Sequence, residues 1–517
     1  MEAVLALCVA AAALILLSSL GGAAGEGAAA AAMAQELRRG FTATHDPSYS
    51  QFQPVLADPT GAFALGFLRV NGTMLDLAVL HLPSAFPLWR AIPDRPAPWS
   101  APATLSFDDG GGLVLTDPAA SKVLWSTSTA GGDRAVLLNT SNLQIQSAAG
   151  GGGVVWQGFD YPSDTIVQGQ NFTSAAALRS SDRRFAMRLG TNYFALYVEP
   201  TPPASAAAAA AMYLKHTALE AKAQIVAGGG AAYARVEPDG FLAMYQREGP
   251  PADVLSFDTF NRGVRALRRM TLEPDGNLRA YYWDLDAARW ALDYTAITDP
   301  CELPTTCGAY AVCSQQPAGR CDCLLGNATD GSGCADAGGG GGGLCGATGG
   351  EVGGLYRAVR RRGAEPVNKE LLASERAASA AECEARCERN CSCWGAVYSN
   401  GTGYCYLMDY PAQLLVEGDD RKLGYFKVRS LEDEEAAARG RGGGQGRGVK
   451  AALLAVGAAA VAGAAAFGAY RVWDRRRRRE GADARRQMGA VDDGLSPGPY
   501  KNLGSFSSVE LTNSFRR

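Results

Sequence analysis

The sequence predicts a mainly β protein with one membrane-spanning helix near its C-terminus, and three observations support this fold class. From about Phe41 to Tyr294 the helical period is mostly missing, and short apolar or alternating runs are separated by Gly, Asp and Pro, a pattern typical of strands joined by turns. Twelve of the 13 cysteines fall between Cys301 and Cys405, which indicates small disulfide-stapled modules. An apolar run of about 20 residues near the C-terminus is long enough to cross a bilayer as a helix.

Residues 1–24 are predicted to be a secretory signal peptide. An Ala/Leu-rich run, Val4 to Leu20, precedes small residues that offer cleavage near Ala24, although the segment before this run carries no Lys or Arg. An uncleaved anchor is the alternative. Cleavage would remove Cys8, the only cysteine outside the cluster.

A repeated phrase in the β region places an Asp-Gly or Gly-Gly turn directly before a strand. Its three copies begin at Asp109, Glu237 and Glu273. Such turns are typical of hairpins or of the faces of a β-prism. The repeats therefore predict at least two β domains.

Two stretches resemble the bulb-type (G-type) lectin domain of plant S-domain receptors. The first runs from Leu105 to Thr127, and the second reads Trp-Gln-Gly-Phe-Asp-Tyr-Pro-Ser-Asp-Thr from Trp156 to Thr165. The resemblance covers most of residues 41–430. It implies tandem bulb-lectin β-prism domains at 41–168 and 169–296.

The family resemblance also implies where a sugar would bind. A bulb lectin that binds mannose uses Gln-x-Asp-x-Asn-x-Val-x-Tyr, whose polar groups bond the sugar hydroxyls. The best copy in this chain fits three of the five positions and consists of Glu273, Asp275, Asn277, Arg279 and Tyr281. Candidates in the first domain keep only Val114 or only Asn142 of the motif. Since such sites fail when polar partners are missing, hairpin turns of a retained scaffold are the favoured interpretation, and Glu273, Asp275, Asn277 and Tyr281 are the candidate sugar-binding residues.

Residues 299–335 resemble the EGF-like module of the same receptors. The spacing is Cys301-x5-Cys307-Gly-Ala-Tyr-x2-Cys313, followed by Cys321-x-Cys323. The resemblance implies the pairs Cys301–Cys313, Cys307–Cys321 and Cys323–Cys334. Zinc is the rival interpretation of a cysteine cluster, but an extracellular setting without nearby His argues against it. We expect no metal and no cofactor.

Residues 345–430 resemble a PAN/apple module. Ser379 and Glu382 form a predicted capping box, which opens a helix carrying Cys383 and Cys387 on one face. Cys391 and Cys393 alternate on a predicted strand and belong to different bridges. The resemblance implies the pairs Cys383–Cys405, Cys387–Cys393 and Cys345–Cys391. It also implies binding of proteins or glycans and a role in dimerisation, with a plain stalk as the alternative.

Residues 449–470 are predicted to span the membrane, between a juxtamembrane linker at 431–448 and a cytoplasmic tail at 471–517. Arg471 and Arg475 to Arg479 follow the span directly, as the positive-inside rule requires. Six N-x-Ser/Thr glycosylation sequons lie only before it, at Asn71, Asn139, Asn171, Asn327, Asn390 and Asn400. The pattern predicts a single-pass type I plasma-membrane glycoprotein with an extracellular N-terminus. An Ala-rich soluble helix is the alternative.

The balance of charge and the missing motifs narrow the function. Residues 471–517 hold 11 Lys/Arg and 6 Asp/Glu, so the rest of the chain is acidic and does not favour nucleic acid. The tail of about 47 residues is too short for a kinase domain, and His45, His81 and His216 lie in no catalytic pattern. The sequence is therefore not expected to encode an enzyme.

We expect a receptor-like glycoprotein that binds an extracellular wall, glycan or protein ligand and signals through a partner such as a receptor kinase. A structural wall-anchoring glycoprotein and a carbohydrate-binding defence lectin are the alternatives. Small residues in the span, such as Ala459 and Gly463, allow close helix contact. Together with the PAN resemblance they favour a homodimer or a heterodimer.

Overall fold

The computed structural model describes residues 33–149, 152–199, 211–218, 232–246, 249–308, 310–324, 356–390, 393–408, 415–428 and 468–471. The predicted signal peptide and linker lie outside these residues, as do the span apart from 468–470 and the tail apart from Arg471. Among the described helices, none combines the length and the apolar character that a membrane crossing requires.

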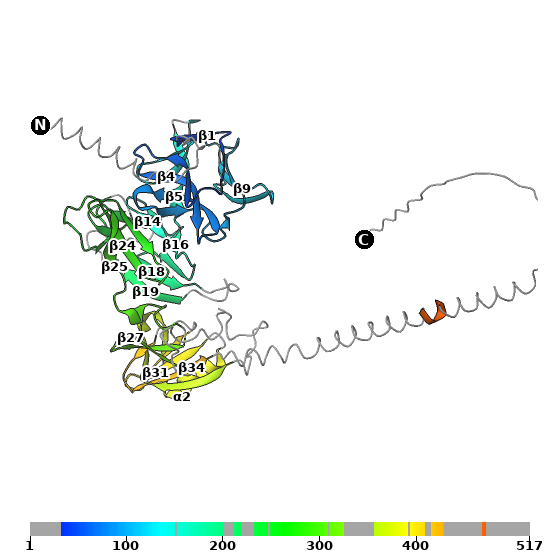
Figure 1. The fold of residues 1–517 in the computed structure, drawn as a ribbon. Coiled ribbons are helices and arrows are strands. Elements are labelled where there is room, and N and C mark those ends of the chain that lie inside the picture. Colours follow the sequence, from blue (N-terminus) through cyan, green and yellow to red (C-terminus); the bar gives the residue numbers. More distant parts are fainter. Residues whose placement is uncertain are drawn as a thin grey trace, which may run out of the picture. The chain divides into compact units, whose positions relative to one another are not determined.

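The first domain consists of three antiparallel sheets around one core (Figure 1). One sheet contains β3 (Phe52–Ala57), β4 (Phe63–Val70), β5 (Met74–His81) and β6 (Phe86–Arg90), with β7 (Ala97–Pro98) beside β5. The second contains β1 (Glu36–Arg38), β11 (Arg134–Leu137), β12 (Leu143–Ser147) and β13 (Gly153–Gln157). The third contains β2 (Thr42–Thr44), β8 (Thr104–Phe107), β9 (Leu113–Asp117) and β10 (Lys122–Ser126). Each sheet sends apolar residues inward, among them Leu65, Ile145 and Leu115, which are fully buried.

The second domain repeats this plan with three four-stranded sheets around a second core. One sheet contains β14 (Thr165–Val167), β23 (Arg268–Leu272), β24 (Leu278–Asp284) and β25 (Arg289–Thr295). Another contains β15 (Phe172–Thr173), β20 (Tyr233–Glu237), β21 (Phe241–Tyr245) and β22 (Asp253–Ser256). The third contains β16 (Ala177–Arg179), β17 (Phe185–Leu189), β18 (Tyr193–Val198) and β19 (Ala211–Thr217). Three sheets around one core form a three-sided prism in both domains.

The repeated phrase forms the turns that it predicts. Gly111, Gly240 and Gly276 adopt φ values of +89°, +86° and +87°, a region that glycine enters without a Cβ clash. Each turn leads into a strand, namely β9, β21 or β24. At Gly276 a Cβ atom would lie 3.2 Å from the Phe185 ring, so this turn also packs tightly against β17.

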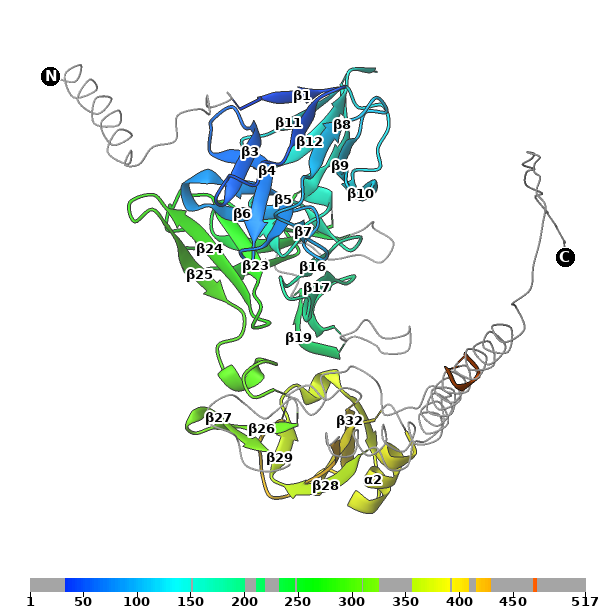
Figure 2. The same ribbon diagram turned by 45° about the vertical axis from the view of Figure 1, so that its right-hand side comes forward.

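The cysteine-rich part folds as two sheets (Figure 2). One contains β26 (Ala311–Gln315), β27 (Ala318–Cys323), β29 (Ala364–Pro366) and β33 (Leu415–Glu417), and β26 pairs with β33 in parallel. The other contains β28 (Arg357–Arg362), β30 (Ala373–Arg376), β31 (Gly395–Ser399), β32 (Tyr404–Met408) and β34 (Lys422–Val428), covered by the helix α2 (Ala380–Arg389). Short 3-10 turns are η1 (Leu82–Ser84), η3 (Gly158–Asp160), η4 (Pro300–Glu302) and η5 (Lys369–Leu371).

Strand pairing differs from the expected domain limits at three places. Strand β1 precedes residue 41 and pairs with β11 of the first domain. Strand β14, expected in the first domain, pairs with β23 of the second. The hairpin β26–β27, within the predicted EGF-like segment, joins the sheet of the PAN segment through β33. Sequence periodicity indicates that a segment is a strand. Which other strand forms hydrogen bonds with its backbone groups depends on the tertiary fold.

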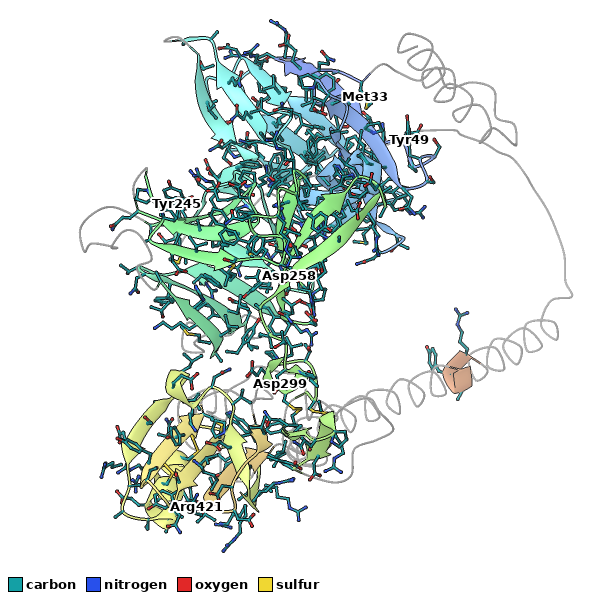
Figure 3. All side chains as sticks on the ribbon, turned by 90° about the vertical axis from the view of Figure 1, so that its left-hand side faces the viewer. Met33, Tyr49, Tyr245, Asp258, Asp299 and Arg421 are labelled. Atoms are coloured by element: carbon teal, nitrogen blue, oxygen red, sulfur yellow. A yellow bond between two sulfur atoms is a disulfide. The ribbon has the colours of Figure 1, made fainter. Side chains whose placement is uncertain are left out.

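Helix α2 begins with a variant of the expected capping box. The Ser379 side chain accepts the Glu382 N–H at 3.2 Å, while the Glu382 carboxylate accepts the Ala378 N–H at 2.7 Å instead of that of Ser379. Cys383 and Cys387 share the buried face of the helix. Figure 3 shows all described side chains as sticks on the ribbon.

Four disulfides join described residues, and each joins cysteines that were expected to pair. They are Cys301–Cys313, Cys307–Cys321, Cys383–Cys405 and Cys387–Cys393. The other two expected pairs involve Cys334, Cys345 and Cys391, which lie outside the described residues. These two pairs stay predictions.

Candidate functional site

The candidate sugar-binding residues lie on the β23–β24 hairpin, and Asn277 is buried there with an exposed fraction of 1%. Its Nδ2 atom donates to the Ile297 carbonyl at 2.7 Å, and its Oδ1 atom accepts the Ile297 N–H at 3.0 Å. The amide therefore ties the start of β24 to the segment after β25. This position gives Asn277 a structural role and keeps it away from a ligand in solution.

The other members of the set bond to one another. The Tyr281 hydroxyl donates to Glu273 Oε1 at 2.8 Å, and Arg279 makes two hydrogen bonds to the Asp275 carboxylate, at 2.6 and 3.1 Å. The Arg269 guanidinium lies 4.1 Å from the centre of the Tyr281 ring. Burial, followed by the Glu273 contact, raises the pKa of Tyr281 to about 12. A sugar would have to break these bonds, so the geometry favours the scaffold interpretation.

A second copy of this arrangement lies on β20 and β21, and the sequence interpretation missed it. The Tyr245 hydroxyl donates to Glu237 Oε1 at 2.7 Å, as does Arg235 Nε. The Arg235 guanidinium lies against the stacked rings of Tyr233 and Tyr245. The signal was present, because a tyrosine follows the first residue of the Glu-Pro-Asp-Gly phrase by eight positions in both copies.

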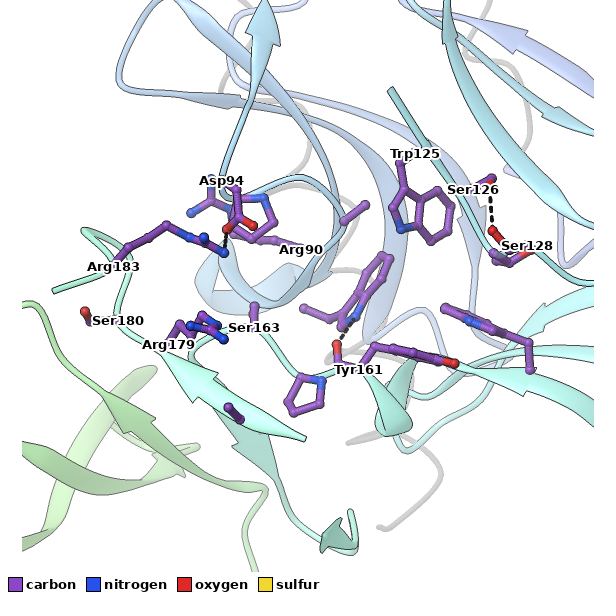
Figure 4. Close-up of a pocket in the computed structure, with 17 residues that line it drawn as sticks. Arg90, Asp94, Trp125, Ser126, Ser128, Tyr161, Ser163, Arg179, Ser180 and Arg183 are labelled. Atoms are coloured by element: carbon purple, nitrogen blue, oxygen red, sulfur yellow. Dashed lines mark hydrogen bonds and ion pairs between the residues drawn. The ribbon is translucent and has the colours of Figure 1, made fainter. Parts of the chain in front are cut away.

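A cavity of about 390 Å³ lies between the first domain and strand β16 of the second domain, and it forms the better candidate site (Figure 4). Trp89, Trp125 and Trp156 meet edge to face on one side, with ring centres 5.6 to 6.1 Å apart. Tyr161 stacks parallel to Trp156 at 5.7 Å and is 59% exposed. The tryptophan cluster is thus anchored in the fold, while the tyrosine offers solvent an aromatic face.

The opposite side of the cavity is polar and basic. Arg183 forms an ion pair with Asp94, and Arg179 lies 3.9 Å from the Glu199 carboxylate. The side chains of Arg179 and Arg183 are 42% and 44% exposed. Figure 4 shows both arginines across the cavity from Trp125 and Tyr161. The cavity therefore combines an aromatic face with cationic groups, as small-molecule sites often do.

A buried carboxylate positions this part of the cavity wall. Asp76 is fully buried, accepts Arg90 Nε at 2.8 Å and accepts the backbone N–H of Ile92 at 2.9 Å. Burial raises the pKa of Asp76, against the opposing effect of Arg90. Arg90 is thereby committed to the scaffold, which leaves Arg179 and Arg183 as the more accessible cations of the cavity.

Sequence analysis pointed to the aromatic side of this cavity but not to its basic side. The Trp156 to Thr165 phrase supported the family resemblance, but it was not interpreted as part of a cavity. Arg179 and Arg183 lie in no recognisable motif. Their place opposite Tyr161 results from the way β16 and the following turn reach the first domain.

Five of the six predicted glycosylation asparagines are described, and all five are exposed. They are Asn71, Asn139, Asn171, Asn390 and Asn400. Asn327 lies outside the described residues. Because modification requires an exposed asparagine, these five positions are accessible to glycosylation. Their glycosylation stays a prediction.

Three family descriptions match parts of the chain. "D-mannose binding lectin" matches residues 87–187, "S-locus glycoprotein domain" matches 251–330, and "PAN domain" matches 360–427. The matched lectin and PAN domains favour a protein that binds carbohydrate or protein over an enzyme.

Curated relatives share these domains. The PAN domain-containing protein At5g03700 of Arabidopsis thaliana is 42% identical over 480 residues, which cover 92% of each chain. The G-type lectin S-receptor-like serine/threonine-protein kinase At5g24080 of Arabidopsis thaliana is 26% identical over 51% of this chain and 33% of its own length. The putative receptor protein kinase ZmPK1 of Zea mays is 29% identical over 69% and 44%. The chain thus spans less than half the length of these two kinases.

Among solved structures, a mannose-binding lectin from Gastrodia elata is 15% identical over 24% of this chain and 96% of its own, with a TM-score of 0.17. The long match to the Arabidopsis protein and the three matched domains show the family. The chain, whose 517 residues contain no kinase domain, therefore belongs to the family of the PAN domain-containing protein At5g03700.

Proposed function

We propose that this protein is a receptor-like membrane glycoprotein that binds an extracellular glycan or protein ligand and signals through a partner. The observation that carries the proposal is the cavity between the two lectin-like domains, with the exposed Tyr161 on one side and Arg179 and Arg183 on the other. Its volume lies within the range of about 300 to 1,000 Å³ that is typical of ligand sites. The neighbouring Glu273 to Tyr281 hairpin is not proposed as the binding site, because its polar groups are internally bonded.

Ligand binding at the cavity is testable with the full-length protein in detergent on a glycan array. Tyr161→Ala should lower the binding of any retained glycan at least tenfold, because it removes the exposed aromatic face. Tyr49→Ala is the matched control, since Tyr49 is 42% exposed and does not line the cavity. If Tyr161→Ala and Tyr49→Ala bind as the wild type does, the cavity is not the site.

The proposed topology is a single pass through the plasma membrane with the N-terminus outside. The apolar run before Arg471, the arginines after it and the one-sided sequons support this topology. Several relatives are named receptor kinases, which is consistent with this topology. An epitope tag after Arg517 should be protected from protease in intact cells, and a tag after Ala24 should be cleaved. The reverse pattern would contradict the proposal.

Signalling would require a partner, because these residues supply no kinase domain. We expect a receptor kinase to co-purify with the full-length protein from membranes in the presence of ligand. Repeated failure to recover one would argue against the proposal. Replacing the tail after Arg479 with an inert sequence distinguishes signalling from structural anchoring. Unchanged biological activity would favour the anchoring role.

Self-association is part of the same proposal. The PAN segment and the small residues of the predicted span supply two contacts, and the second becomes effectively intramolecular once the first has formed. Gly463→Ile combined with Gly468→Ile should reduce cross-linking at the cell surface. Unchanged cross-linking would exclude the span as a dimer contact.

A further inference from the structure

We propose that the cavity between the lectin-like domains takes an acidic saccharide, whose uronate carboxylate is held by Arg179 and Arg183. This inference rests on the proposed function, since it assigns a ligand class to the same cavity. It adds a preference for charge that the family descriptions do not contain.

The lining of the cavity has more cationic than acidic side chains. The lining contains three arginines, Arg90, Arg179 and Arg183, and one carboxylate, Asp94. Arg90 is committed to the buried Asp76. Around the two accessible arginines, three guanidinium groups (Arg179, Arg183 and Arg188) face two carboxylates (Asp94 and Glu199). The cavity therefore retains a positive charge, to which a carboxylate is the complementary group.

The two accessible arginines, Arg179 and Arg183, are held only by exposed or shared ion pairs. Arg179 lies 3.9 Å from Glu199, but Glu199 is also bonded to Arg188. Arg183 is paired with Asp94, and both of these side chains are more than 40% exposed. Exposed ion pairs of this kind contribute little stability. A ligand carboxylate can therefore replace Asp94 on Arg183 at low cost and reach Arg179 from the same cavity.

The aromatic face of the cavity favours a saccharide over a simple anion without a sugar ring. The Tyr161 ring is exposed and lies parallel to Trp156, with an angle of 9° between the planes. The C–H face of a pyranose is apolar and packs on such rings, while its hydroxyls need polar neighbours. Ser126 and Ser128 supply hydroxyl groups in the same lining, 3.0 Å from each other. Figure 4 shows these serines beside Trp125 and the arginines across the cavity.

The test measures binding of the full-length protein in detergent to three probes of equal length. They are an oligogalacturonate, its methyl ester and a neutral galactose oligomer. The oligogalacturonate should bind at least tenfold tighter than its ester, and this preference should shrink as salt is raised. Arg179→Gln should remove most of the preference. Arg184→Gln is the control, because Arg184 is paired with Asp182 and does not line the cavity.

Asp94→Asn provides an independent test, in which the expected result is a gain of affinity and not a loss. It removes the competing carboxylate from Arg183, so the acidic probe should bind severalfold tighter while the neutral probe is unchanged. Unchanged affinity for the acidic probe would count against the assigned role of Arg183.

The possible failures are distinguishable. Equal binding of the acid and the ester, lost in Tyr161→Ala, would overturn the acidic preference and leave the proposed ligand cavity intact. Poly-glutamate that binds as tightly as the oligogalacturonate would show a preference for anionic peptide and overturn the saccharide. Absence of binding by every probe would overturn the inference, while the glycan array with Tyr161→Ala decides the broader proposal separately.

Discussion

His81 shows how a single side chain can make the stability of this protein depend on pH. It is 4% exposed, its Nδ1 atom lies 2.9 Å from Ser84 Oγ, and its ring lies 4.8 Å from that of Trp283 and 5.4 Å from that of Trp290. Desolvation by burial lowers its pKa to about 4. The imidazole is therefore neutral in the folded protein at mildly acidic pH.

The first prediction follows from this lowered pKa. Between the unfolded value of about 6.5 and the folded value, the unfolded chain binds the proton more readily, so the free energy of unfolding falls as pH decreases. We expect His81 to account for a loss on the order of 1 to 3 kcal/mol from pH 7 to pH 4. Denaturant unfolding at both pH values, compared with His81→Gln, measures this loss. An identical pH dependence in the variant would contradict the assignment.

The second prediction concerns Asn277, whose amide bonds both backbone groups of Ile297. Asn277→Ala should lower the free energy of unfolding by about 2 to 3 kcal/mol, because it leaves buried polar groups unpaired, and should leave the ligand affinity of the folded protein unchanged. Thermal unfolding and glycan binding are the measurements, with the exposed Asn192→Ala as the control. Lost binding at unchanged stability would restore Asn277 as a sugar ligand.

At the scale of the element, the C-terminal end of helix α2 is held by a lysine on strand β34. Lys427 on β34 is 1% exposed, and its Nζ atom donates to the carbonyls of Cys387 at 2.8 Å and Asn390 at 3.0 Å. These carbonyls lie at the C-terminal end of the helix, where the backbone dipole favours a positive charge. Together these contacts explain how a lysine is accommodated in the interior.

The third prediction is that Lys427→Met destabilises the PAN segment by about 2 to 4 kcal/mol, because buried carbonyls lose a charged donor. Hydrogen exchange in α2 of the full-length protein should become faster, while exchange in the lectin-like domains stays unchanged. Lys369→Met is the control, since this side chain is 47% exposed and paired only at the surface. Unchanged exchange in α2 would show that the disulfides alone hold the helix.

At the scale of the molecule, the two lectin-like domains meet through an aromatic and cationic contact. Trp290 Nε1 donates to Ser84 Oγ at 2.9 Å, which links β25 to the turn after β5. The Arg269 guanidinium lies between Phe86 of the first domain and Trp290 of the second, 3.7 and 4.9 Å from the ring centres. Burial lowers the pKa of Arg269 to about 10. This contact predicts that the two domains unfold together.

The fourth prediction tests that coupling. Trp290→Ala removes the hydrogen bond and one of the rings around Arg269, so calorimetry should resolve separate unfolding transitions for the two domains. Leu285→Ala is the control, because Leu285 is 74% exposed at the turn of the same hairpin. A single transition in the Trp290 variant would mean that the coupling depends on other contacts.

The local features of this protein follow from residues that are close together in the chain. Strand periodicity and the Asp-Gly phrases indicated the β region and its turns, because each depends on residues adjacent in the chain. Ser379 and Glu382 indicated the start of α2, although the backbone N–H that donates to the Glu382 carboxylate is that of Ala378 and not that of Ser379. The cysteine spacing and the Trp156 phrase supported the family resemblance, which supplied four disulfide pairs later found in the fold.

The environment of each side chain, in contrast, depends on the folded chain. Asn277 matched a sugar-binding motif, yet the segment after β25 buries it. Arg179 has no motif, yet it faces Tyr161 across a cavity. Strand β26 was expected in a separate module, yet it pairs with β33 about 100 residues later. Sequence pattern reports which face of a strand a residue occupies, whereas burial and partners depend on which distant segment covers that face, and only the folded chain specifies this.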